Sequence, residues 1–195
     1  TLENLENRVR VKKDMDLLRA AAATTRFGQT RLCMYENRFL PEQETQFAAM
    51  TFLLDDGTMF VVYRGTDNSL VGWKEDFNMT FQQSIPAQRL AQEYIRRAAQ
   101  SAEAPIRVAG HSKGGNLAVF AAARCSPQVR ARILEVYNND GPGFTKYMMG
   151  DPGYLEVVPR IHTFVPQSSV IGMLLEHEEP YQVLRSSNVG IMQHD

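Results

Sequence analysis

Residues 107–118 read RVAGHSKGGNLA, and this stretch decides the fold. A short apolar run ends at Gly110, a serine stands between glycines, and helix-forming residues follow as far as Arg124. Gly110 to Gly114 match G-x-S-x-G, a pattern that places a serine on a sharp strand-to-helix turn above a parallel sheet. We expect strained backbone at Ser112, with glycines that let strand and helix pass closely. Ser112 is therefore a candidate nucleophile.

The overall composition is that of an ordinary globular protein. The chain has 195 residues, of which 44% are hydrophobic and 22% charged, and its formal net charge is -1. We expect one domain over residues 1–195, and the lack of terminal signals leaves open a truncation at one or both ends. The charge gives no reason to expect nucleic acid or an anionic membrane surface. No apolar run approaches a membrane span and the start is charged, so we expect a cytoplasmic protein.

The two cysteines, Cys33 and Cys125, lack the spacing of metal ligands. Buried free thiols are the favoured interpretation, although a disulfide between them stays open. The sequence implies no metal.

Apolar spacing predicts the secondary structure. Helices are expected over residues 14–25 and 86–99, and strands over residues 31–35, 45–54, 59–63, 133–137 and 161–165. Asp55-Asp56-Gly57 joins two of these strands as a tight antiparallel hairpin. From Pro86 onward helices and strands alternate, which is typical of parallel strands joined by crossover helices. The sequence therefore predicts an α/β fold whose mostly parallel sheet begins with antiparallel strands.

Two further motifs precede the strand-to-helix turn at Ser112, which we call the elbow. Arg64-Gly65-Thr66 follows an apolar strand, and Trp73-Lys74-Glu75-Asp76-Phe77 comes soon after it. With the Gly-His-Ser-x-Gly-Gly of residues 110–115, they resemble the class 3 lipase family of α/β-hydrolases. Residues 112–118 and 138–144 are similar to a bacterial branch of lipase-like proteins whose function is not established. The resemblance implies an α/β-hydrolase-type three-layer sandwich and ester chemistry, but no particular substrate.

The resemblance also implies that Thr66 is an oxyanion-hole residue. The second donor should be the backbone N–H of Lys113, directly after the nucleophile, because two donors must face the oxygen that becomes negative. The alternative for Thr66 is a strand-end residue that satisfies turn backbone. Arg64 and Asp76 are implied to pair and to brace this loop.

A serine needs a base to accept its proton, and the sequence offers four histidines. His194 is favoured because α/β-hydrolases place the histidine last in the chain, after the final strands. The alternative is an exposed histidine near a frayed end. We expect His111 to point away from Ser112 and to have a packing or hydrogen-bonding role, His162 to lie in the core or on a sheet face, and His177 to lie in a solvated, charged loop.

The carboxylate that would orient the histidine departs from the pattern of the class 3 lipases. Class 3 lipases usually supply an aspartate near residues 165–169, where this chain has no carboxylate. Asp140, in the loop after the preceding strand, has a permitted chain order and lies at the carboxyl end of a parallel strand. Its alternative role is an Asx-type turn residue. Two other possibilities stay open. Glu176 or Ser168 could orient the histidine instead, or the triad could be incomplete.

Two apolar segments flank these motifs. Ser69 to Trp73 lie where secreted family members carry a lid, and the alternative is a loop that packs Trp73 against the core. Val170 to Leu175 are candidates for lining an acyl pocket, although core packing is favoured.

The sequence thus predicts a serine hydrolase that cleaves a carboxylic ester of a small-molecule or lipid acyl substrate. In this hypothesis Ser112 attacks, His194 transfers the proton, Asp140 orients the histidine, and Thr66 and Lys113 hold the oxyanion. No cofactor is implied, and thioester hydrolysis or acyl transfer would use the same parts. The competing hypothesis is a catalytically silent hydrolase fold that serves as a binding or assembly module.

Overall fold

The computed structural model describes residues 9–43, 45–66, 84–188 and 193–194. Within these ranges the strands form a single sheet in which neighbours along the chain are neighbours in space. The strands are β1 (Arg31–Leu40), β2 (Thr45–Leu53), β3 (Met59–Tyr63), β4 (Ile106–His111), β5 (Ile133–Asn139), β6 (Ile161–Pro166) and β7 (Tyr181–Leu184). β1, β2 and β3 pair antiparallel, whereas β3 to β7 pair in parallel. The predicted sheet is therefore confirmed.

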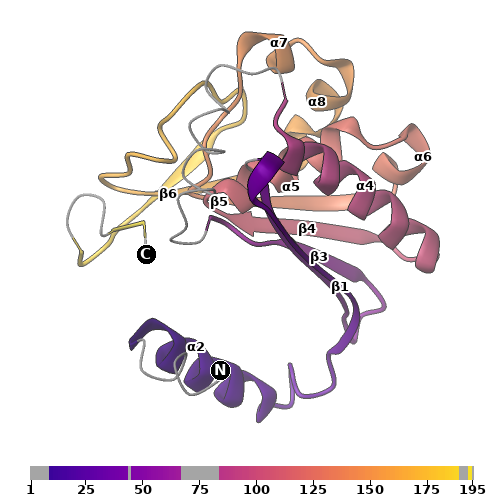
Figure 1. Cartoon of the computed structure of the whole chain (residues 1–195), viewed down its shortest axis with the longest axis vertical. Helices are drawn as coiled ribbons and strands as arrows, with labels where there is room; N and C mark the ends of the chain where they lie inside the picture. The colour runs from indigo at the N-terminus through magenta and orange to yellow at the C-terminus, as the bar shows by residue number, and fades with distance from the viewer. Residues whose placement is uncertain (1–8, 44, 67–83, 189–192, 195) are drawn as a thin grey trace.

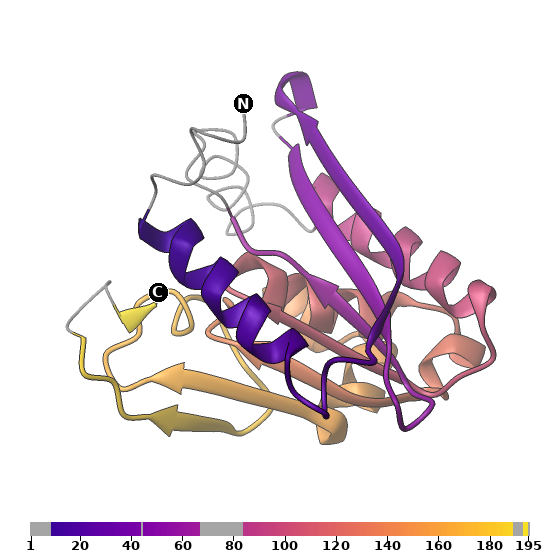
Figure 2. The ribbon, with the colours of Figure 1, turned by 90° about the horizontal axis from the view of Figure 1, so that it is seen from below.

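Helices lie on both sides of this sheet. They are α2 (Val9–Ala22), α4 (Pro86–Ser101), α5 (Lys113–Arg124), α6 (Pro127–Arg130), α7 (Lys146–Met149) and α8 (Pro152–Val157). α4, α5 and α8 pack together over one face, and α2 lies on the opposite side (Figures 1 and 2). The arrangement agrees with the predicted α/β architecture.

The sequence of α4 explains where this helix begins and which face it buries. Pro86 is compatible with the first turn, and the side-chain Oε1 of Gln88 accepts a hydrogen bond from the backbone N–H of Ile85 at 3.0 Å. The helix carries an apolar stripe that is buried apart from the half-buried Leu90, and its members are Ala87, Leu90, Ala91, Tyr94, Ile95 and Ala98. Its large members are Tyr94 and Ile95. α4 therefore presents one apolar face to α5 and the sheet.

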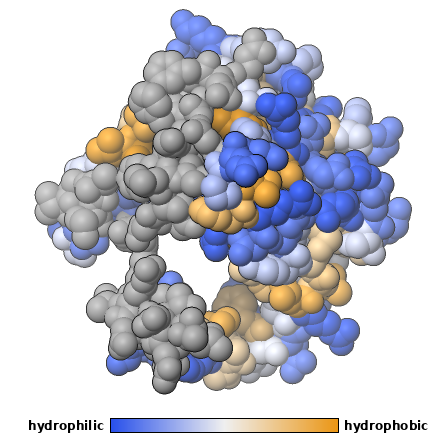
Figure 3. Space-filling view, viewed as in Figure 1, coloured by the Kyte–Doolittle hydropathy of each residue, from blue (hydrophilic) through white to orange (hydrophobic). Residues whose placement is uncertain are grey.

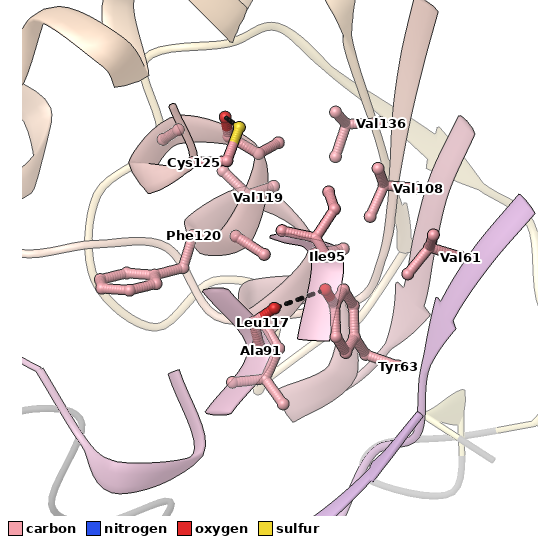
Figure 4. Close-up of a cluster of buried hydrophobic side chains, with 14 of the residues drawn as sticks. Val61, Tyr63, Ala91, Ile95, Val108, Leu117, Val119, Phe120, Cys125 and Val136 are labelled. Carbon is pink, nitrogen blue, oxygen red and sulfur yellow. Dashed lines mark hydrogen bonds between the residues drawn. The ribbon is translucent and has the colours of Figure 1, made fainter. Parts of the chain in front are cut away.

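The core lies between α4, α5 and the central strands (Figure 4). All residues of α5 from Lys113 to Ala123 are buried, and most are Gly or Ala, so neighbouring elements approach the helix closely. Tyr63 of β3 donates its hydroxyl hydrogen to the carbonyl of Ala91 in α4 at 2.8 Å, which satisfies a buried polar group. Burial of an aliphatic side chain such as Leu117 contributes about 1.5–3 kcal/mol.

Three strands differ from the prediction. β1 extends to Leu40 and β5 to Asn139, and β7 was not predicted. Polar residues break the apolar pattern at both strand ends, so pairing with β2 and with β4 and β6 continues where the hydrophobic signal stops. β7 is a short edge strand whose residues are all exposed, and it therefore lacks a buried face that periodicity would reveal.

Both cysteines are free, but only one is buried. Cys125 ends α5 inside the core, where burial raises the pKa of its thiol to about 11. Cys33 is exposed on β1, so the expectation of a buried thiol is wrong there. Arg31, Leu32 and Cys33 are all exposed at the start of this edge strand, where the pairing with β2 shifts register between Leu32 and Met34.

Large apolar side chains also reach the surface, as the orange areas between blue ones in Figure 3 show. Many of them come from α2 and from the two edge strands, among them Leu17, Leu18, Leu32, Tyr35, Phe39, Tyr181, Val183 and Leu184. Over the ranges that the structure describes, no helix is both long and apolar enough to span a bilayer.

The close approach of α5 to β3 gives a testable prediction. A Cβ atom on Gly114 would lie 2.2 Å from the carbonyl oxygen of Tyr63, so Gly114→Ala should destabilise the fold by about 3 kcal/mol. Gly150→Ala is the control, because its Cβ would meet nothing closer than 3.9 Å. Urea unfolding measures both changes, and a Gly114→Ala protein as stable as the unchanged chain would contradict this packing.

Candidate active site

The turn between β4 and α5 has the strained geometry that its sequence predicts. Ser112 has φ 58° and ψ -133°, a conformation that costs a non-glycine residue about 1–3 kcal/mol. Its backbone N–H donates to Asn139 O at 2.9 Å, and its carbonyl accepts from Gly115 N at 2.8 Å. The elbow is thus fixed to the end of β5 and to the first turn of α5.

Asp140 and His194 meet although 54 residues separate them. The Asp140 side chain, only 5% exposed, accepts a hydrogen bond at Oδ2 from His194 Nδ1 at 2.5 Å. Because a carboxylate only accepts hydrogen bonds, the proton lies on Nδ1. In the neutral imidazole this leaves Nε2 as the basic atom.

His194 also lies beside the elbow. Its ring centroid is 4.6 Å from that of His111, the residue before Ser112, and the two rings are inclined by 34°. The packing role expected for His111 is therefore found, and its partner is His194. The structure brings the predicted base and acid into contact, and the base packs against the residue that precedes the predicted nucleophile.

The second oxygen of the Asp140 carboxylate has a partner that the sequence did not reveal. Ser169 Oγ donates to Asp140 Oδ1, and Ser169 Oγ accepts from Gly172 N–H at 2.9 Å. Only the missing carboxylate at residues 165–169 drew attention to this segment. Such a contact depends on how two loops pack, which local patterns do not report.

The other candidates for orienting the histidine have different partners. The exposed Glu176 carboxylate lies 4.0 Å from Lys146 Nζ. Ser168 uses its backbone N–H, which donates to Gln193 Oε1 at 2.8 Å. Among the alternatives that the sequence left open, only Asp140 contacts His194 in the described part of the chain.

The loop that carries Asp140 is held from the helical side. Asn116 of α5 donates from Nδ2 to Pro142 O at 3.1 Å and to Gly143 O at 3.0 Å. Gln88 of α4 in turn donates to Asn116 Oδ1 at 2.8 Å. The Asx-type role considered for Asp140 belongs to Asn138, whose Oδ1 accepts from Gly141 N–H at 3.1 Å. The carboxylate of Asp140 therefore remains available to other partners.

The loop with Thr66 approaches the elbow. A Cβ atom on Gly65 would lie 3.2 Å from Ser112 Cβ and 2.7 Å from His111 O, so the glycine permits this contact. Thr66 follows Gly65 and is partly buried, and Lys113 begins α5 directly after the serine. Asp76 and the lid segment Ser69 to Trp73 lie outside the described residues.

The side chain of Lys113 does not face solvent at the elbow. It is buried, and its ammonium donates to the carbonyl of Gln46 at 2.9 Å and to Gln46 Oε1 at 3.3 Å. The positive charge is thus bound to β2, and this side-chain position is compatible with a backbone role for Lys113.

The remaining histidines have different environments. His162 stacks on Tyr137 with centroids 5.3 Å apart and lies 3.7 Å from Glu135, so the prediction of a sheet-face residue is confirmed. His177 was predicted to be solvated, and this is wrong, because its side chain is only 7% exposed. Its Nδ1 contacts Glu179 Oε1 at 3.0 Å and its Nε2 contacts Gly172 O at 2.9 Å.

Charge pairing explains why a charged segment is buried here. Glu179 accepts from Thr163 Oγ1 at 2.7 Å and from Tyr154 OH at 2.9 Å in addition to His177. Burial alone would lower the pKa of His177, but Glu179 and the Gly172 carbonyl outweigh it and the pKa is raised. Burial alone would raise the pKa of Glu179, but hydrogen bonds from His177 and Thr163 lower it. Both ring nitrogens of His177 face oxygen acceptors, an arrangement that favours the imidazolium beside the Glu179 carboxylate.

The apolar segment Val170 to Leu175 does not join the core as expected. Val170, Met173 and Leu174 are exposed, and they flank the buried Gly172. A Cβ atom on Gly172 would lie 2.2 Å from Asp140 Oδ1, so this segment runs directly past the carboxylate. In the described part of the chain, no group of three or more His, Cys, Asp or Glu side chains could hold a metal ion.

The fold is that of the lipase-like α/β-hydrolases. A fungal lipase in complex with an inhibitor is 16% identical over 80% of this chain and 66% of its own, with a TM-score of 0.52. The Rhizomucor miehei lipase in a propeptide complex is 14% identical over 85% and 66% respectively, with a TM-score of 0.60, and the M37 lipase is 13% identical over 86% and 62%, with a TM-score of 0.58. The chain thus spans less than two thirds of the length of these lipases.

Residues 21–195 match the sequence profile of the Mbeg1-like family, and the chain belongs to this family. No curated protein matches the sequence. The expected membership of a bacterial branch stays a prediction.

The His177–Glu179 pair predicts a pH-dependent stability. His177 contributes fully below its ordinary pKa of 6.5, and this contribution is lost as the pH rises through the raised folded-state pKa. Glu179 contributes fully above 4.5, and its contribution is lost as the pH falls through the lowered folded-state pKa. His177→Gln should therefore destabilise by about 1–3 kcal/mol at pH 5.5 and by less at pH 8.5.

Urea unfolding at the two pH values measures this difference. His162→Gln is the matched control, because His162 is partly exposed and its nearest carboxylate is 3.7 Å away. An effect of His177→Gln that is equal at both pH values would contradict the charged pair.

Proposed function

We propose that this protein is a serine hydrolase that cleaves a carboxylic ester of a small-molecule or lipid acyl substrate. The observation that carries the proposal is the 2.5 Å hydrogen bond from His194 Nδ1 to the buried Asp140 carboxylate, beside a serine in the strained elbow conformation. This bond fixes the imidazole tautomer that a general base needs. The lipase-like fold supports the reaction class.

The proposed reaction proceeds through an acyl-enzyme. His194 Nε2 accepts the hydroxyl proton of Ser112 while Oγ attacks the carbonyl carbon of the ester. The tetrahedral intermediate collapses, the C–O bond to the alcohol breaks, and the alcohol leaves with the proton from His194. Water, deprotonated by the same imidazole, then attacks the acyl-enzyme and releases the carboxylic acid and Ser112.

The oxyanion would be held by the backbone N–H of Lys113 and by Thr66. Lys113 is suited to this role because its backbone N–H directly follows the nucleophile, at the amino end of α5. The close approach of Gly65 to Ser112 supports a position for Thr66 on the other side of the same oxygen. Two donors at this point would stabilise charge that develops only during the reaction.

A fluorophosphonate probe tests the nucleophile and the base. We expect the probe to label Ser112, Ser112→Ala to abolish labelling, and His194→Ala to slow it at least about a thousandfold. His162→Ala is the control and should label at the unchanged rate. Peptide mass spectrometry locates the adduct; an unlabelled Ser112, or equal labelling in His194→Ala, would favour the silent binding module instead.

Hydrolysis of p-nitrophenyl esters tests the acid. Asp140→Asn keeps the shape of the side chain but permits the wrong imidazole tautomer, so kcat should fall by up to about 10⁴-fold. Asp14→Asn on the exposed part of α2 makes the same chemical change far from the elbow and should leave kcat unchanged. Acyl chains from two to sixteen carbons would define the substrate class, and full activity in Asp140→Asn would refute the role of Asp140.

A further inference from the structure

We propose that Ser169 is a positioning residue for Asp140, held in place by a buried chain of hydrogen bonds through Gly172, His177 and Glu179. The inference rests on the proposed function for its catalytic meaning. Its structural content is that a loop outside the triad fixes the orientation of the acid. Each link of this hydrogen-bond chain is supported by its own distances and contacts.

The first link is the division of the Asp140 carboxylate between two partners. Oδ2 accepts from His194, and Oδ1 accepts from Ser169 Oγ. Because the side chain is buried, each oxygen needs a donor to offset the loss of water. With both oxygens held, the carboxylate cannot rotate about its Cβ–Cγ bond without breaking a hydrogen bond. Ser169 thereby keeps Oδ2 directed at the imidazole.

The second link sets the direction of the Ser169 hydroxyl. A serine hydroxyl has one hydrogen to donate, and it can also accept. Ser169 Oγ accepts from Gly172 N–H at 2.9 Å, so its own hydrogen is free to point at Asp140. The backbone N–H of Ser169 donates to Pro166 O at 3.0 Å, which ties the turn to the end of β6.

The third link anchors Gly172. Its carbonyl accepts from His177 Nε2 at 2.9 Å, and His177 Nδ1 donates to Glu179 at 3.0 Å. Glu179 is fixed by Thr163 of β6 and Tyr154 of α8. The acid is therefore connected through buried groups to two rigid elements of the fold.

Apolar packing does not provide this anchorage. Val170, Met173 and Leu174 expose much of their side chains, so the segment between Ser169 and Glu179 has few large buried residues to hold it. Its polar contacts with the rest of the protein include those described above, the hydrogen bond from Gly143 N–H to Leu174 O at 2.9 Å and the pairing of Phe144 with Glu176. The hydrogen-bond chain that ends on the carboxylate is the part of these contacts that reaches Asp140.

The test uses the His194 Nδ1 proton as a reporter that does not depend on catalysis. In protein with ¹⁵N-labelled histidine, this strongly bonded proton should give a low-field NMR signal that Asp140→Asn removes. Ser169→Ala should increase its exchange rate with water about tenfold, because the carboxylate loses one of its two restraints. Ser169→Thr keeps the hydroxyl and should restore the slow exchange.

Ser101→Ala is the matched control, since it removes a serine hydroxyl that donates to Ala98 O in α4, away from the elbow. It should leave the His194 signal unchanged. Glu179→Gln removes the charge at the far end of the chain and should change the exchange in the same direction as Ser169→Ala. Unchanged exchange in Ser169→Ala would overturn the inference, and unchanged exchange in Glu179→Gln would overturn the part beyond Gly172.

Ester hydrolysis by the same variants separates the inference from the proposed function. Ser169→Ala should lower kcat about tenfold at unchanged KM, because the base is misoriented while the substrate site is intact. Faster exchange of the His194 proton in a protein that hydrolyses no ester would refute the proposed function and support the positioning role. Unaltered kcat and exchange in Ser169→Ala within an active enzyme would refute the positioning role alone.

Discussion

The hydrogen bond between His194 and Asp140 depends on the position of one buried carboxylate. Asp140 follows β5 in a left-handed conformation, with φ 52°, and its backbone N–H is bound to Phe164 O of the neighbouring strand at 2.7 Å. A buried charge is costly unless every oxygen has a partner. The surrounding structure therefore has to hold both the backbone and the side chain of this residue. The contacts around Asp140 meet this requirement from two sides.

On the helical side, Gln88 and Asn116 connect the beginning of α4 to the loop after Asp140. On the strand side, Ser169 and Gly172 connect the loop after β6 to the carboxylate itself. Each of these connections is a hydrogen bond between groups that are buried or partly buried, so displacement of either partner is resisted. The strained Ser112 is bound through its own backbone N–H to Asn139 O.

Sequence reasoning found the elements whose signals are local. The glycines around Ser112 and the alternation of helix and strand report backbone requirements. Chain order and loop position favoured Asp140 and His194, which the structure brings into contact. It missed Ser169, and it placed His177 in solvent, because these roles arise where separate loops meet. Taken alone, the charges of residues 176–179 indicate a solvated segment. The contact between His177 and Glu179 offsets the cost of removing both side chains from water, so the two can be buried.

The position of Asp140, the proposed acid, is related to the adjacency of β5 and β6. Asn139 pairs with Phe164, so the loops after these parallel strands begin side by side. A carboxylate from either loop lies near the same region, and this chain has the aspartate after β5 and a serine in the segment where the lipases it resembles carry an aspartate. Two carboxylates in contact would repel and one would tend to be protonated. A neutral hydroxyl at Ser169 instead donates to Asp140, so the departure from the family pattern supplies the hydrogen bond that a second acid would have opposed.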